Sequence, residues 1–200
     1  MKIIAALAAA SLMTAAHAQT AKVGQPAPGF EATTADGATV RLSDFAGEAV
    51  VLEWTNDGCP FVQKHYATKN MQNLQKRMTA DGTVWLSVIS SAPGEQGHAD
   101  GARANALTAE RDAAPTHVLL DEDGSLGRLY GARTTPHMYV IDAEGVLRYA
   151  GAIDTIPSAN ADDVPRADNY VEAALRAVKA GGDVTVRQTQ PYGCSVKYGS

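Results

Sequence analysis

Residues 50–66, VVLEWTNDGCPFVQKHY, carry the clearest structural signal in this 200-residue chain. This stretch starts inside an apolar run, residues 49–55, whose length and β-branched side chains are typical of a buried strand. Cys59 follows, directly before Pro60. Proline is favoured at the first position of a helix, because its missing N–H would have no partner there. We therefore expect a strand, Cys59 as the cap residue, and a helix that begins at Pro60.

The cap position predicts a reactive thiol at Cys59. Free backbone N–H groups and the positive end of the helix dipole stabilise a thiolate there. An ordinary cysteine has a pKa near 8.5, and helix N-termini lower it to about 3.5–7.5. Lys64 and His65 can add positive charge, although His65 reads more simply as a surface residue of the helix. The alternative is an inert cysteine that packs as a small apolar residue.

Expected strands and helices alternate along the rest of the chain. A hairpin over 32–42 turns at Asp36-Gly37, and another joins 137–142 to 146–153. The other expected strands are 83–90 and 116–121, and the expected helices are 60–79, 102–113 and 170–180. This order predicts a mixed α/β sheet with helices on both faces.

The two ends of the chain differ from the part between them. Residues 1–18 have a positive Lys2, an apolar run and an A-x-A cleavage pattern, which predicts a signal peptide and a periplasmic mature protein. We expect one domain over 19–182 and a tail over 183–200, without a membrane span in the mature chain. The net charge of −5 and the lack of a basic patch argue against a nucleic-acid partner.

The tail carries Cys194, the only cysteine besides Cys59. Two cysteines in an oxidising compartment can form one disulfide. That disulfide could be a structural staple. It could also be redox-active, because a nucleophilic thiolate needs a second sulfur to resolve its mixed disulfide or sulfenic acid.

Four motifs together resemble the thioredoxin superfamily over residues 23–180, and more specifically its peroxiredoxin-like, or AhpC-TSA-type, redoxins. The motifs are LSDFAGEAVVLEWTNDGCPFV, TTPHMYVID, YAGAID and YGCSVKY. The resemblance implies a thioredoxin-like fold with an N-terminal hairpin extension. It also implies that Pro136 is the cis-proline, and that Thr135, Pro136 and His137 lie beside Cys59.

Three positions bear on this resemblance: two depart from the family pattern and one matches it. Val62 replaces the second cysteine of C-x-x-C, and Asn56 stands where peroxiredoxins have Thr or Ser. Glu53 lies six residues before Cys59, the offset at which thioredoxins bury an acid. Burial raises a carboxyl pKa, which would make Glu53 a proton acceptor for a thiol. The alternative is a strand-edge Glu53 that reaches solvent.

The main functional prediction is an exported thiol-dependent redox enzyme that uses Cys59, Cys194, Glu53 and Pro136. It needs no bound cofactor or metal; its electrons come from a thiol/disulfide protein partner, and a small peroxide is a possible substrate. Two alternatives stay open. One is a periplasmic copper-binding chaperone that holds Cu(I) with Cys59 and a histidine, and the other is a redox-inactive redoxin with a structural disulfide.

Overall fold

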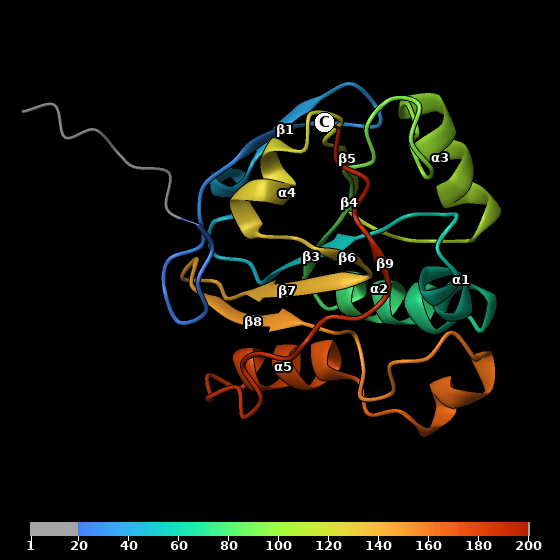
Figure 1. The fold of residues 1–200 in the computed structure, drawn as a ribbon. Coiled ribbons are helices and arrows are strands. Elements are labelled where there is room, and N and C mark those ends of the chain that lie inside the picture. Colours follow the sequence, from blue (N-terminus) through green and yellow to red (C-terminus); the bar gives the residue numbers. More distant parts are fainter. Residues whose placement is uncertain (1–19, 200) are drawn as a thin grey trace, which may run out of the picture.

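The computed structural model describes residues 20–199, and a seven-stranded mixed sheet forms its centre (Figure 1). The predicted signal peptide lies outside the described residues. The strand order is β2-β1-β5-β4-β3-β7-β8. The strands are β1 (Glu31–Thr34), β2 (Thr39–Arg41), β3 (Val50–Trp54), β4 (Val84–Ile89), β5 (His117–Leu120), β7 (His137–Ile141) and β8 (Leu147–Gly151).

The strand before Cys59 lies in the middle of this sheet. β3 pairs in parallel with β4 on one side and antiparallel with β7 on the other. Every residue of β3 and β4 is buried, which explains why both strands read as continuous apolar runs rather than alternating ones. The mixed sheet and the predicted hairpins are confirmed.

Helices cover both faces of the sheet (Figure 1). Val51 and Trp85 share one apolar cluster with α1 (Pro60–Ala67), α2 (Asn70–Ala80) and α5 (Tyr170–Lys179). Leu52 and Leu86 point to the opposite face, where they pack with α4 (Ser125–Tyr130). The remaining elements are the helix α3 (Gly101–Glu110), the 3-10 turns η1 (Leu42–Phe45) and η2 (Ala161–Arg166), and the short strands β6 (Thr134–Thr135) and β9 (Cys194–Ser195). The described helices include none long and apolar enough to cross a membrane.

The predicted single helix over 60–79 is wrong, because the chain forms two helices there. Lys69 adopts a left-handed backbone conformation with φ of 59°, which ends α1 and starts α2. The Thr68 hydroxyl donates to the Lys64 carbonyl oxygen at 2.8 Å and closes the last turn of α1. The apolar spacing continues across the break through Met71 and Leu74, so periodicity alone does not reveal it.

The C-terminal segment crosses the molecule from the α5 side to α4 (Figure 1). It first extends the sheet beside β8, where Gln188 bridges Ala150. It then pairs with β6 through β9 and ends where Tyr198 packs against Gly124 and Gly127. We call residues 192–199 the strap.

A two-cysteine site at the start of helix α1

Cys59 is the N-cap of α1, as predicted, and Pro60 occupies the first turn. The Cys59 backbone is extended, and its carbonyl oxygen accepts from the Val62 and Gln63 N–H groups at 3.0 and 2.8 Å. The side chain is 0% exposed. The loop before it is shaped by Asn56, whose Oδ1 accepts from the Gly58 N–H at 2.9 Å and whose Nδ2 donates to the Gln96 carbonyl oxygen at 3.0 Å. Asn56 therefore holds the loop that delivers Cys59 to the helix.

The loop around Pro136 packs on the Cys59 sulfur. The Thr135–Pro136 peptide bond is cis, as the resemblance implied. The Cys59 thiol donates to the Thr135 carbonyl oxygen, with 3.1 Å between Sγ and O. Within residues 20–199, the buried Thr135 hydroxyl has no other hydrogen-bond partner, so it is free to donate to a Cys59 thiolate.

The strap places Cys194 beside Thr135, the residue that also contacts Cys59. β9 pairs antiparallel with β6, and Cys194 lies opposite Thr135 in the register. Both cysteines are free thiols, with Cys59 buried and Cys194 half-buried. Both cysteines therefore lie against the same residue, Thr135.

The two sulfurs have different acidities. Burial alone would raise the pKa of Cys59, but hydrogen bonds from the Cys194 thiol, Thr135 and the Cys194 and Val62 N–H groups outweigh it and lower that pKa. Burial, together with the hydrogen bond to Cys59, raises the pKa of Cys194 to about 11. Cys59 is therefore the more acidic of the two thiols.

Glu53 is buried beneath this site, with 0% exposure. Its Oε1 accepts from the Tyr66 hydroxyl at 2.9 Å. Its Oε2 accepts from Trp85 Nε1 at 2.8 Å, and from Gln75 Nε2 and Ser87 Oγ at 3.0 Å each. Burial raises the pKa of the carboxyl group, and these four donors oppose the rise. The described hydrogen bonds connect Glu53 to neither sulfur, so any proton transfer to it needs an intermediate group.

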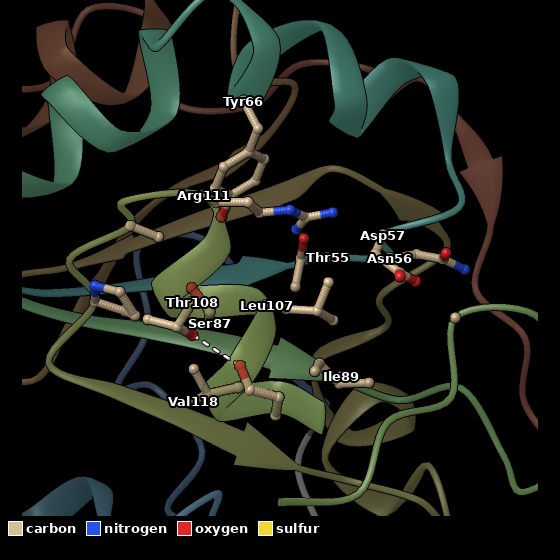
Figure 2. A pocket seen from close by; sticks show the side chains of 14 residues that line it. Thr55, Asn56, Asp57, Tyr66, Ser87, Ile89, Leu107, Thr108, Arg111 and Val118 are labelled. Atoms are coloured by element: carbon tan, nitrogen blue, oxygen red, sulfur yellow. Dashed lines mark hydrogen bonds between the residues drawn. The ribbon is translucent and has the colours of Figure 1, made fainter. Parts of the chain in front are cut away.

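A small cavity lies between β4, β5, α1 and α3, next to Thr55 at the end of β3 (Figure 2). The Arg111 guanidinium stacks over the Tyr66 ring at 4.4 Å, and the buried Thr55 hydroxyl has no hydrogen-bond partner in the part of the chain that the structure describes. The cavity volume is about 30 Å³, which is room for about one water molecule. It is therefore too small to be a substrate site.

Two expectations about histidines are wrong. His65 is fully buried rather than on the surface, and burial lowers its pKa to about 3. It is neutral near pH 7 and adds no positive charge to Cys59. His137 packs on Tyr139 with ring centroids 4.6 Å apart, whereas Cys59 clusters with Met138 on the other face of β7. Successive strand residues point to opposite faces, so His137 follows Pro136 in sequence without its side chain reaching the sulfur.

Sequence reasoning missed a buried polar cluster behind the site. Lys64, His65 and Asp154 are 3%, 0% and 4% exposed, and they surround the hydroxyl end of Tyr192. No pattern in the sequence connects these positions, because they come from α1, the segment after β8, and the strap. Over residues 20–199, no group of three or more His, Cys, Asp or Glu side chains is arranged to hold a metal ion.

Solved structures with similar folds include two proteins that span nearly the whole chain. A hypothetical protein from Sinorhizobium meliloti 1021 is 23% identical, with a TM-score of 0.73 over 91% of this chain and 97% of that one. An uncharacterized conserved protein from Geobacillus kaustophilus is 25% identical, with a TM-score of 0.74 over 89% and 93%. A putative thiol:disulfide interchange protein DsbE from Chlorobium tepidum is 25% identical, with a TM-score of 0.52 over 66% and 85%.

A search of curated protein sequences found no match. The model of the AhpC/TSA family, in contrast, matches residues 23–150. That range contains the strand, the capped cysteine and the cis-proline loop, and it covers more than half of the chain. The chain belongs to the AhpC/TSA family and is a thioredoxin-fold redoxin.

Proposed function

We propose that this redoxin is an exported thiol–disulfide oxidoreductase in which Cys59 is the nucleophile and Cys194 is its resolving cysteine. The observation that supports this most directly is the register of β6 and β9, which brings Cys194 opposite the residue whose carbonyl oxygen accepts from Cys59. A purely structural pair of cysteines would not require a low pKa at one sulfur and a raised pKa at the other.

The proposed reaction has two steps. The Cys59 thiolate attacks a disulfide of a partner protein, which forms a mixed disulfide and releases one partner thiolate. Cys194 then loses its proton to solvent and attacks the Cys59 sulfur, which releases the second partner thiolate. The partner gains two electrons and this chain ends with a Cys59–Cys194 disulfide. The reverse sequence oxidises a partner dithiol.

Trapping the intermediate tests the proposal. Cys194→Ser should accumulate a stable mixed disulfide with oxidised glutathione as the partner, because the released glutathione thiolate diffuses away and the second step is blocked. Cys59→Ser should form none, and the natural chain should lose two hydrogen atoms by mass spectrometry without retaining the partner. Failure of the natural chain to form the Cys59–Cys194 disulfide would contradict this function.

Reduction of a small peroxide is a second candidate activity, favoured by the Thr135 hydroxyl, which is near Cys59 and has no other hydrogen-bond partner within residues 20–199. Attack of the thiolate on the peroxide O–O bond would give Cys59 sulfenic acid and an alcohol or water. Cys194 would then form the disulfide and release water. The test is consumption of hydrogen peroxide by the reduced chain, with Thr135→Val as the variant. We expect a slower reaction in the variant, because the hydroxyl can no longer donate to the reacting oxygen.

Export rests on the pattern of residues 1–18. We expect protein recovered from the periplasm to start at Gln19, as measured by intact-mass spectrometry. Recovery of the full 200-residue chain from the cytoplasm alone would exclude this localisation.

A further inference from the structure

We propose that Tyr192 is a positioning residue that sets Cys194 against Cys59, and that it acts through the buried Asp154–Lys64 pair. This inference rests on the proposed function of the two cysteines. Tyr192 lies two residues before Cys194, at the point where the strap leaves the α5 side and reaches α1.

The Tyr192 hydroxyl is anchored on a buried carboxylate. It donates to Asp154 Oδ1, which also accepts from the Ile156 N–H at 3.1 Å. Asp154 Oδ2 lies 3.9 Å from Lys64 Nζ, and Lys64 Nζ donates to the Ile156 carbonyl oxygen at 3.2 Å. Asp154 therefore cannot move without breaking contacts to both α1 and its own loop. The two charged groups do not hydrogen-bond to each other, but the backbone of Ile156 bonds to both of them and holds them in place.

Helix α1 also holds the Tyr192 ring. Phe61 packs edge-on against it, with ring centroids 5.9 Å apart, and the Lys64 ammonium lies 5.1 Å from its centroid. The Asn70 amide lies 2.9 Å from His65 Nδ1 and donates to it, which leaves the proton of the neutral ring on Nε2, 3.5 Å from the Tyr192 hydroxyl. The helix that presents Cys59 at its N-cap is thus the same helix on which Tyr192 docks.

Gly193 connects the anchored Tyr192 to Cys194. A side chain at this position would place its Cβ 2.0 Å from the Thr135 carbonyl oxygen, and the φ of +130° favours glycine. The strap therefore lies directly on the Thr135 backbone, and the next residue is Cys194. One residue, Gly193, separates the Tyr192 anchor from Cys194, which limits how far the second sulfur can move from Cys59.

The far end of the strap provides a matched control. The Tyr198 hydroxyl donates to the Ala132 carbonyl oxygen at 2.8 Å, and its ring packs under the Arg128 guanidinium. Tyr198 is four residues beyond Cys194, and the Val196 N–H bond to the Arg133 carbonyl oxygen lies between them. Loss of the Tyr198 hydroxyl should therefore loosen the end of the strap without moving Cys194.

The experiment uses the full chain and an aromatic disulfide reagent whose released thiolate absorbs light. Attack by Cys59 releases one equivalent, and closure by Cys194 releases a second. We expect Tyr192→Phe to slow the second phase about tenfold. The variant loses one buried hydrogen bond to a charged group, and such a bond contributes at least about 1.4 kcal/mol, which corresponds to a factor of ten. Tyr198→Phe should change the rate of the second phase less than twofold. Asp154→Asn removes the carboxylate that accepts from the Tyr192 hydroxyl and faces Lys64, so it should also slow the second phase, and an unchanged second phase in this variant would contradict a role for the pair.

The outcomes separate the two proposals. If the natural chain shows no second phase, Cys194 does not resolve Cys59 and both proposals fall. If the second phase is present and Tyr192→Phe leaves it unchanged, or Tyr198→Phe slows it equally, only the positioning role of Tyr192 is overturned. A slower second phase in Tyr192→Phe, with a thermal unfolding midpoint close to that of the Tyr198→Phe control, supports positioning over a general loss of stability.

Discussion

Cys59 and Cys194 differ in acidity although they contact the same residue, Thr135. Burial, together with the hydrogen bond to Cys59, raises the pKa of Cys194, whereas the hydrogen bonds that Cys194 donates lower the pKa of Cys59. Only the sulfur that carries the charge can start thiol–disulfide exchange, because the thiolate is the nucleophile. Cys194 can attack only after its proton is removed.

We expect alkylation of reduced Cys59 by iodoacetamide to have a pH midpoint below the ordinary value of about 8.5. The lowered pKa of Cys59 keeps a larger thiolate fraction near neutral pH. Peptide mass mapping after short pulses measures each cysteine separately, and Cys194 should be modified only at higher pH. A midpoint for Cys59 at or above 8.5 would restore the inert interpretation of this thiol.

The buried carboxylate of Glu53 depends on its four donors. Tyr66→Phe removes one of them while keeping the ring under Arg111. We expect the free energy of unfolding in urea to fall by about 2 kcal/mol, the scale of a buried hydrogen bond to a charged group. Tyr170→Phe is the control, because the Tyr170 hydroxyl makes no hydrogen bond within residues 20–199. Equal stabilities of the two variants would contradict this role of Tyr66.

At the scale of elements, sequence patterns predicted β3, the cap at Cys59 and both hairpins, because each has a local signal such as an apolar run, Cys-Pro or Asp-Gly. The α1–α2 break was missed since Lys69 carries no glycine-like signal for its left-handed backbone. Helix α4 was missed because six residues, SLGRLY, are too few to show a period. The cluster of Lys64, Asp154 and Tyr192 is a tertiary arrangement, and no local pattern encodes it.

The break between the two helices offers a test of backbone conformation. Lys69→Gly should stabilise the fold by up to about 1 kcal/mol, because glycine adopts the φ of 59° without the penalty that a Cβ incurs. Thr68→Gly is the matched control: it has ordinary negative φ and donates to Lys64, so it should lose stability. Chemical denaturation of both variants measures the difference. A loss of stability in Lys69→Gly would show that the left-handed turn is not a source of strain.

For the whole molecule, stability should depend on pH through two buried histidines. Burial lowers the pKa of both His65 and His137 to about 3, whereas unfolded histidine titrates near about 6.5. Between these values the unfolded chain binds more protons than the folded chain. The free energy of unfolding should therefore fall as pH decreases from about 6.5 to about 3. Glu53 opposes this trend, because its raised pKa favours the folded state in acid.

Comparison of variants isolates the histidine contribution. His137→Gln should flatten the slope of unfolding free energy against pH in this window, and His65→Gln should do the same. His98→Gln is the control, since His98 is partly exposed and pairs with Glu122 at 3.0 Å. Urea titrations at half-unit pH intervals give the slopes. An unchanged slope in both buried-histidine variants would mean that neither residue resists protonation in the folded protein.

The strap also determines when the site can be completed during synthesis. Ribosomes release the N-terminal end first, so β3, Cys59 and the cis-proline loop emerge well before Cys194. Until residues 194–195 have emerged, β6 lacks its partner β9 and Cys59 lacks the second sulfur beside it. An incomplete chain that contains Cys59 without Cys194 would leave a mixed disulfide at Cys59 unresolved. The order of synthesis therefore separates the proposed nucleophile from its proposed resolving partner in time.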